Sequence, residues 1–592
     1  MKRRRCTSSS YEELAGWIGA RGGKIHDECF EIVQGNKDDE GSHLRAKRDL
    51  APGDCLFSIP PSSMITWRTV CTSAVGRVIG EDEGKFSDHV AAIELQHQRL
   101  ENMSGSELLA DIVLSRKLAT SDGASDESSI SVAPITDRGV LLLYIMDARF
   151  GEEKCNHLVT NSFAPFVKSF PSRFGLPLMW PVEALAMLGR CVLGISTLKS
   201  VAALTKIIVN DFQSLKRNPV IFSECDDEIC AEKELEEKRR GLRRLLSDSS
   251  AFEHYLWASA AVSSRSFGDI AAIAGRNLPR DLKDLDHEQM QYQYPKNTLG
   301  IMVPVLDMLN HDPEAAQVEW QSIPADGSVS LSSAEQSALG TRACPSNGDF
   351  PRLVVRRPII KGMQIFTHYG ADRSNEELLI SYGFTQHNNV DNDELVVGWG
   401  LENEDTSVAQ AVAMHTIGSQ EKHKWDKAEL VAAQESIIRS LEAGGKLEIP
   451  LTLNKPVPYL LRQIAYALCC NKDGTPSAQW HVWRFLESKL VKLLLHLKSV
   501  FDDIPTLIPK FQVEYTGEEM NITETLKNWD TIIEHHRSRG VVRVQSVSGE
   551  YGEVENTYAT SPMACTIALF DSKLSILRHS YICSKVEFEK NS

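Results

Sequence analysis

The sequence predicts an α+β fold, in which short strands are split by a helical insert and followed by an all-helical region. Three observations lead to this prediction. Residues 25–66 form short strand-like runs, residues 67–215 follow mostly helical patterns, and strand-like runs return between residues 299 and 369. From about residue 400 the apolar residues again recur at the helical period. We therefore expect the strands on both sides of the insert to form one domain and the remaining chain to form a second.

The composition is that of a folded globular protein. The chain has 592 residues, which is more than one hydrophobic core usually serves, so two or more domains are expected. Its 42% hydrophobic and 24% charged residues exclude the disordered and collagen-like classes. The net charge of −16 argues against a surface that wraps nucleic acid. None of the 13 cysteines forms a Cys-x-x-Cys pair, so we expect reduced thiols and no metal site.

The ends and the hydropathy of the chain say little about its compartment. We find no apolar run of 18 residues, so no membrane span is expected. The basic start Met1-Lys2-Arg3-Arg4-Arg5 lacks a following hydrophobic segment, which argues against a secretory signal. It is either a solvated tail or a nuclear or organellar address. We expect a cytoplasmic and/or nuclear protein.

The first strand segment covers residues 25–75 and follows a tail, residues 1–24, with a short helix from Tyr11 to Ile18. The turn Ala51-Pro52-Gly53-Asp54 has good hairpin chemistry, because proline fixes φ and glycine accepts a left-handed backbone. Three strands are expected around these turn residues: Phe30–Val33, Leu44–Ala46 and Cys55–Pro60.

Residues 76–250 are expected to form the helical insert. Apolar helices are predicted at 141–147 and 182–193, and residues 119–133, rich in serine and aspartate, read as a surface loop. An acidic linker that starts at Glu224 lies near the end of the insert. Four prolines predict that the segment between these two helices consists largely of loops: Pro165, Pro171, Pro177 and Pro181.

Residues 251–390 supply the second group of strands. A helix over 251–266 carries Arg265 at its end. An insertion at 321–350 interrupts the strands; it is either a surface loop, which we favour, or a lid over the substrate. Strand patterns are expected at 299–308, 315–320, 352–357 and 363–369.

Residues 391–592 are expected to form an all-helical domain. Asp426 can cap a helix whose apolar residues follow the helical period. Further helices are predicted at 460–468 and 481–501. No fixed-period repeat supports a solenoid.

Two polar motifs are placed where a ligand site is plausible. Asn310-His311 closes an apolar run, although asparagine and histidine compete with the backbone for hydrogen bonds and favour turns. Tyr369-Gly370 and Tyr382-Gly383-Phe384 supply two phenols 13 residues apart, with a short apolar helix between them. The phenols are candidates for the walls of a narrow aromatic slot. Each motif alone is equally consistent with a surface turn beside a core helix.

In this order, the motifs resemble a SET domain of the Rubisco large-subunit methyltransferase-like class, whose members methylate protein lysine or, in one branch, histidine. The resemblance covers about residues 25–390, and residues 391–592 take the place of the family's substrate-binding domain. The matching pieces are Glu40–Asp54, Phe163–Pro171 with Leu176–Trp180, Trp257 with Ser264-Arg265, Asn310-His311, and Tyr369–Phe384.

The resemblance implies S-adenosylmethionine as the methyl donor. Two arginines would pair with its carboxylate. The asparagine and backbone carbonyls near an aspartate would hold its ammonium, and the histidine with the Gly-Phe turn would hold adenine. The residues at these positions are Arg45, Arg265, Asp307, Asn310, His311, Gly383 and Phe384.

Three of these residues also have a structural interpretation. Arg265 suits a helix C-terminus, where the helix dipole favours a cation. Asp307 can orient a neighbouring turn, and Arg45 can be one more surface cation beside Lys47 and Arg48.

The resemblance also implies the catalytic groups Tyr369 and Tyr382. A lysine nucleophile must be neutral, although its free pKa is about 10.4. An apolar aromatic channel disfavours the ammonium and lowers that pKa. Tyr369 would orient the amine, and Tyr382 would line the channel and limit the number of methyl groups that fit.

Some features leave alternatives open. The family's opening turn is Gly-x-Gly, but this chain has Gly41-Ser42-His43; His43 either crowds the donor, contacts the substrate, or reflects a one-residue misalignment. Tyr382 favours a lysine acceptor over histidine. The rival from another class is a non-catalytic SET-like adaptor. We expect a monomer whose C-terminal helices bind a protein substrate, with neither nucleic acid nor membrane as partner.

Overall fold

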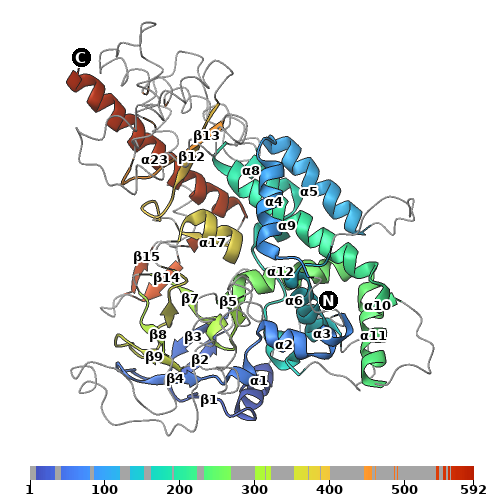
Figure 1. The fold of residues 1–592 in the computed structure, drawn as a ribbon. Coiled ribbons are helices and arrows are strands. Elements are labelled where there is room, and N and C mark those ends of the chain that lie inside the picture. The colour runs from blue at the N-terminus through green and yellow to red at the C-terminus, as the bar shows by residue number, and fades with distance from the viewer. Residues whose placement is uncertain are drawn as a thin grey trace, which may run out of the picture. The chain divides into compact units, whose positions relative to one another are not determined.

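The computed structural model divides into two compact units (Figure 1). The first comprises Met1–Leu185, Leu198–Ala371 and Ile380–Gly383, and the second Ala186–Thr197, Asp372–Leu379 and Phe384–Ser592. The structure describes residues 9–33, 42–79, 86–120, 134–151, 162–189, 192–222, 233–267, 300–313, 315–321, 352–370, 373–386, 389–400, 446–455, 461, 486, 490, 542–545, 551–554, 558–559 and 562–591.

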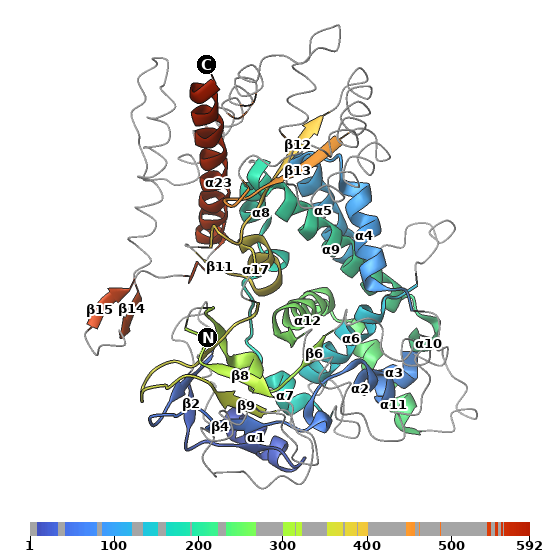
Figure 2. The ribbon, with the colours of Figure 1, turned by 60° about the vertical axis from the view of Figure 1, so that its left-hand side comes forward.

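A four-stranded antiparallel sheet joins the two strand segments of the first unit. Its order is β1-β4-β9-β8, with β1 at Lys24–Ile25, β4 at Cys55–Ser58, β9 at Arg352–Val355 and β8 at Val318–Gln321. Figure 2 shows β4, β9 and β8 side by side. Strands from before and after the insert therefore meet in one sheet.

A second contact between the two segments starts at the hairpin of β2 (Phe30–Val33) and β3 (His43–Ala46). The Ala46 N–H donates to the Met363 carbonyl at 2.9 Å, and the Ile365 N–H donates to the Leu44 carbonyl at 2.8 Å. The backbone of β3 is thus paired on both sides.

Two short strand pairs lie near the polar motifs, and one of them contains Asn310-His311. β7 (Asn310–His311) pairs in parallel with β10 (Phe366–Thr367), and β5 (Ser266–Phe267) pairs with β6 (Ile301–Met302). The predicted strand over 299–308 is wrong beyond Met302. Pro304 has no N–H to offer a strand ladder, and the chain turns into a 3-10 helix instead, η3 (Leu306–Met308).

The described residues of the insert are mostly helical, and α12 ends at Arg265. The described residues of the predicted helix over 182–193 lie in α8 and at the start of α9. Side-chain caps account for several starts: Thr66 forms a capping box, and Asp88 and Thr136 accept backbone N–H bonds. Together with α1 (Ser9–Gly19), which contains the predicted N-terminal helix, the helices are η1 (Pro61–Ser63), α2 (Trp67–Thr72), α3 (Ala74–Ile79), α4 (His89–Leu100), α5 (Gly105–Thr120), α6 (Asp137–Phe150), α7 (Ala164–Lys168), η2 (Pro177–Met179), α8 (Val182–Gly189), α9 (Val192–Lys216), α10 (Pro219–Phe222), α11 (Lys233–Leu246) and α12 (Ala251–Arg265).

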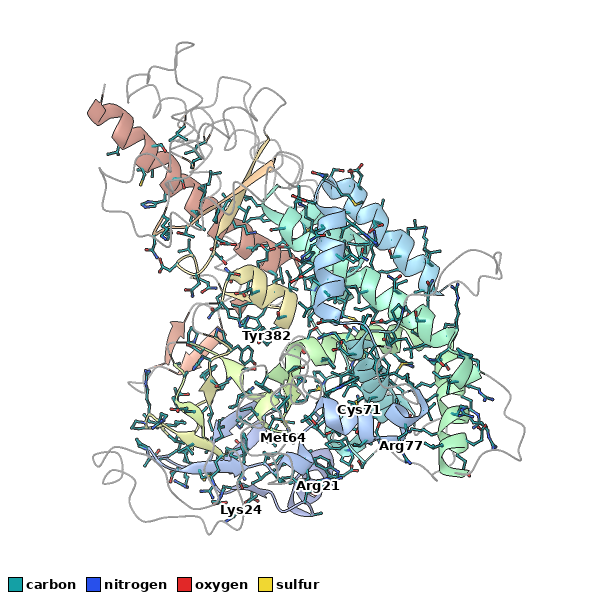
Figure 3. The ribbon with its side chains drawn as sticks, in the orientation of Figure 1. Arg21, Lys24, Met64, Cys71, Arg77 and Tyr382 are labelled. Carbon is teal, nitrogen blue, oxygen red and sulfur yellow. The ribbon has the colours of Figure 1, made fainter. Side chains whose placement is uncertain are left out.

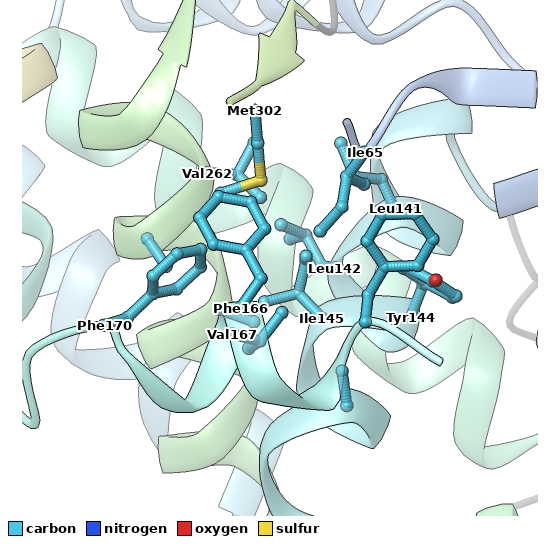
Figure 4. Close-up of a cluster of buried hydrophobic side chains, with 14 of the residues drawn as sticks. Ile65, Leu141, Leu142, Tyr144, Ile145, Phe166, Val167, Phe170, Val262 and Met302 are labelled. Carbon is cyan, nitrogen blue, oxygen red and sulfur yellow. The ribbon is translucent and has the colours of Figure 1, made fainter. Parts of the chain in front are cut away.

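The core of the first unit joins the insert to the strands. Figure 4 shows side chains of α6, α7 and α12 packed together with Ile65 and with Met302 of β6. Ile65 and Met302 exchange backbone hydrogen bonds of 3.0 Å. Each fully buried side chain of this kind contributes about 1.5–3 kcal/mol. This packing fixes the C-terminal end of α12 beside β6, where the candidate site begins.

We expected no membrane span from the sequence, but one helical segment is long and apolar enough to be a candidate. Among the described residues, Leu193–Phe222 is long and apolar enough by length and composition. Because 61% of its apolar window is buried inside the structure, it also fits the core helix of a soluble protein.

The second unit is not all-helical in its described residues, so this prediction is wrong there. β12 (Leu395–Gly400) pairs with β13 (Lys446–Leu451). β14 (Val542–Gln545) pairs with β15 (Tyr551–Val554), and β11 (Thr385–Gln386) pairs with β16 (Tyr558–Ala559). Valine and tryptophan in β12 are typical strand residues. The helix α23 (Pro562–Asn591) follows these strands.

Several predictions fall largely outside the described residues. These are most of the loop at 119–133, nearly all of the insertion at 321–350, and the helix capped by Asp426. Of the helices predicted at 460–468 and 481–501, only Leu461, Leu486 and Leu490 are described, and all three are helical and buried.

Candidate functional site

The end of α12 forms a buried ion pair with η3. Arg265 Nη1 donates to the Asp307 carboxylate at 2.5 Å and to the Asp307 backbone carbonyl at 2.8 Å. The guanidinium also lies 5.3 Å and 5.8 Å from the ring centres of Phe170 and Phe174. The sequence prediction that Arg265 and Asp307 belong to one site is consistent with this contact, which also brings two aromatic residues of the insert to the site.

The ion pair is desolvated and incompletely hydrogen-bonded. The Asp307 side chain has 0% exposure and that of Arg265 has 11%. Burial raises the pKa of Asp307, and Arg265 opposes that rise. Within the described part of the chain, Arg265 Nε and Asp307 Oδ1 are buried without a hydrogen-bond partner. Buried polar groups in proteins are generally satisfied, so Arg265 Nε marks a place where a ligand can complete the site.

The backbone before Asp307 is strained. Val305 has φ of +70°, and it is the one described non-glycine residue with positive φ. For a β-branched side chain this conformation is a genuine outlier, and such strain clusters at functional sites. Val305 is completely buried, so the surrounding packing holds the strained turn in place.

Tyr369 is held at two points by the segment that precedes and forms β7. Its hydroxyl donates to the Leu309 carbonyl at 2.6 Å, and its backbone N–H donates to His311 Nδ1 at 2.9 Å. The second bond requires that the neutral His311 ring carries its proton on Nε2. Burial raises the pKa of the Tyr369 phenol well above its ordinary value, so the phenol stays neutral.

The two phenols predicted to line one slot lie together. The ring centres of Tyr369 and Tyr382 are 4.5 Å apart, and those of Tyr369 and His311 are 5.1 Å apart. Tyr382 lies at the end of α17 (Asn375–Tyr382), as Figure 3 shows. Three polar aromatic rings, from residues far apart in the sequence, therefore form one wall.

The turn after Tyr382 is packed against the insert. Gly383 has φ of +82°, and a Cβ at this position would lie 2.6 Å from the Gly175 carbonyl carbon and 2.7 Å from the Leu176 nitrogen. Only glycine fits both the conformation and the space. This contact ties Tyr382 to the 163–180 segment of the insert.

The other residues that the sequence predicted for the site make different contacts from those of the ion pair and the three rings described above. Arg45 pairs with Glu31 across β2 and β3 at 2.6 Å, and both side chains are 43% exposed. His43 begins β3 opposite Val33 and is half-buried. Asn310, also half-buried, lies opposite Phe366 in the strand pair. Phe384 belongs to the second unit, so its role at the adenine stays a prediction.

Sequence reasoning missed several contributors to the site. Phe170 and Phe174 lie on either side of Pro171 in the insert motif, so the sequence could have predicted aromatic side chains close to the site. No sequence signal marked Val305, because a β-branched valine normally predicts a backbone with negative φ. No metal cluster is present among the described residues.

Comparison with known proteins gives one curated relative. No protein-family model matches the chain. Ribosomal lysine N-methyltransferase 1 of Saccharomyces cerevisiae (strain ATCC 204508 / S288c) is 24% identical over 293 residues. The chain is similar in sequence to a lysine methyltransferase. The match covers 47% of this chain, and the chain spans about two fifths (42%) of the relative's length. By its name this relative is a lysine methyltransferase, which is one of the activities that the resemblance of the motifs implies.

Two solved structures also match across nearly the whole chain. The structure of Rubisco LSMT bound to AdoMet has a TM-score of 0.48 at 12% identity, and covers 99% of this chain and 94% of that one. The SET domain of LSMT bound to lysine and AdoHcy has a TM-score of 0.45 at 13% identity, with the same coverage. Both scores are below one half, and we draw nothing further from them.

Proposed function

We propose that this protein is an S-adenosylmethionine-dependent protein methyltransferase of the SET-domain, Rubisco large-subunit methyltransferase-like class, and that its acceptor is a lysine side chain. The observation that carries the proposal is the double anchoring of Tyr369 to Leu309 and His311, with Tyr382 stacked beside it. A half-buried, neutral phenol held through both its hydroxyl and its backbone N–H is suited to orient a small polar nucleophile in a channel.

The described residues fit the proposed donor. S-adenosylmethionine supplies an electrophilic methyl group on a sulfonium. Arg265 would hold its carboxylate, because the guanidinium is fixed at the end of α12 and keeps a buried Nε without a partner. Asn310 and His311 would hold the ammonium and adenine. We favour Arg265 over Arg45 for the carboxylate, because Arg45 is half-exposed and already paired with Glu31.

Tyr369 would act as an orienting group and not as a base. Its hydroxyl proton is directed to the Leu309 carbonyl, so the phenol oxygen keeps lone pairs that accept an N–H from the incoming amine. That bond turns the nitrogen lone pair toward the methyl carbon. The amine must lose its proton to solvent before it attacks, and the desolvating wall of rings lowers its pKa.

Tyr382 would set the space beside the reacting nitrogen. A tyrosine ring 4.5 Å from Tyr369 leaves little volume for methyl groups on the nitrogen. This side chain favours lysine over the flat imidazole of histidine as acceptor. We further propose that the acceptor is a protein of the cytoplasm or nucleus and that the second unit recognises it.

A labelling experiment tests the proposal. Purified protein is incubated with a cell lysate and S-adenosylmethionine that carries a labelled methyl group, and the modified residue is identified by mass spectrometry. We expect methyl-lysine in one or a few proteins. Asn310→Ala serves as the control and should lose donor binding and labelling together. Label on histidine would contradict the lysine acceptor, and absence of both donor binding and label in the wild type would favour the adaptor.

A further inference from the structure

We propose that Asp307 is a positioning residue, whose carboxylate and backbone carbonyl together aim Arg265 at the carboxylate of the bound donor. This inference rests on the proposed function. It differs from the earlier expectation that the neighbourhood of Asp307 contacts the donor's ammonium.

The contact geometry carries the first step. One nitrogen of Arg265, Nη1, donates to two oxygens of the same residue: the Asp307 carboxylate at 2.5 Å and its backbone carbonyl at 2.8 Å. Two acceptors on one residue define the plane of a guanidinium better than one does, because the group is rigid and its donors have fixed directions. The two bonds therefore fix the orientation of the guanidinium relative to η3.

Burial carries the second step. The Asp307 side chain has no exposure at all, whereas that of Arg265 is 11% exposed. A ligand that arrives from solvent can therefore reach the guanidinium, but it cannot reach the carboxylate without a rearrangement. Asp307 must act through Arg265.

The surroundings carry the third step. The rings of Phe170 and Phe174 lie within 6 Å of the guanidinium carbon, which restricts its movement on that side. Val305, two residues before Asp307, is completely buried, and the packing around it holds this strained turn and Asp307 in place. An arginine restrained in this way loses little conformational freedom when it binds a carboxylate, which is the benefit of preorganisation.

The test compares two nucleosides that differ by one carboxylate. S-adenosylhomocysteine and its decarboxylated form, 5′-deoxy-5′-(3-aminopropylthio)adenosine, are titrated into the full-length protein by calorimetry. The ratio of their dissociation constants measures how well Arg265 recognises the carboxylate. For a charge-assisted hydrogen bond in the wild type we expect a ratio of roughly 10–100.

Four variants separate positioning from a general structural role. Arg265→Gln should reduce the ratio to near 1, and Asp307→Ala should do the same although Arg265 is intact. Arg265→Gln combined with Asp307→Ala should lower the ratio no further than either single change. Asp307→Asn keeps the size and one acceptor oxygen, so it should lose only about threefold of the ratio. A loss of fold that weakens binding in general would reduce both affinities and leave their ratio unchanged.

The outcomes are distinguishable. A wild-type ratio retained in a folded Asp307→Ala protein would overturn the inference while leaving the proposed function intact. If Asp307→Ala does not fold, an unchanged ratio in Asp307→Asn would overturn it. A wild type that binds neither nucleoside would refute the proposed function itself.

Discussion

Gly383→Ala probes how tightly the turn after Tyr382 is packed against the insert. An added methyl group would lie 2.6 Å from one backbone atom of Gly175 and 2.7 Å from one of Leu176, and neither can move like a flexible side chain. The φ of +82° adds about 1–2 kcal/mol for any L-residue. Overpacking adds about 1–3 kcal/mol. We expect a total loss of about 2–5 kcal/mol in unfolding free energy.

Gly362 provides a matched control. Its φ is +86°, almost the same as at Gly383, but nothing lies within 4 Å of an added Cβ. Gly362→Ala should therefore show the conformational cost alone. Chemical denaturation of both variants measures the difference, which we expect to be about 1–3 kcal/mol. Methyl transfer should fall strongly only in Gly383→Ala, because Tyr382 is displaced. Equal stability losses in the two variants would refute the close packing of this turn.

Three further outcomes are expected. Lys238→Met should lower the unfolding free energy by about 3–5 kcal/mol, because the carboxylate of Asp147, which is 3% exposed, would lose the cation 2.6 Å away. Adding Asp147→Leu should restore most of this loss in denaturation curves. Burial raises the pKa of Asp211 to about 6, so between about pH 4 and 6 the folded protein holds a proton that the unfolded chain has lost. The stability that this proton contributes is present below about pH 4 and is lost as the pH rises through 6. In denaturation curves recorded from about pH 4 to 7, the unfolding free energy of Asp211→Asn should therefore fall less than that of the wild type, by on the order of 2–3 kcal/mol. If the two proteins lose the same free energy over this range, the raised pKa of Asp211 is disproved. Tyr382→Ala should shift the product toward more highly methylated lysine in intact-mass measurements; an unchanged distribution would remove Tyr382 from the control of methyl number.

The part of the site that could be predicted is the part that depends on local sequence. The helical period over 251–266 places Arg265 at the end of α12, and the phenols at positions 369 and 382 flank a helix that is short enough to bring them together. Asn310-His311 was a readable departure from an apolar strand, and its pairing with β10 explains its proximity to Tyr369.

The part that could not be predicted depends on contacts between distant residues. The partner of Arg265 is 42 residues away, and spacing alone gives no reason to choose Asp307 as an ion-pair partner. The family resemblance assigns Arg45 to the donor. Its ion pair with Glu31 could not be predicted, because that contact depends on the register of β2 and β3, which the sequence does not define. The strand β12 was missed because its period-2 pattern is short and lies at the border of a region with helical periodicity.

Tyr369→Phe gives the most direct test of the central claim. The substitution keeps the ring beside Tyr382 and the backbone bond to His311, and it removes only the hydroxyl. The rate of methyl transfer at saturating S-adenosylmethionine is measured together with the dissociation constant of the donor. We expect donor affinity within about threefold of the wild type and a rate reduced on the order of a hundredfold or more. A wild-type rate in Tyr369→Phe would contradict the catalytic role of this phenol.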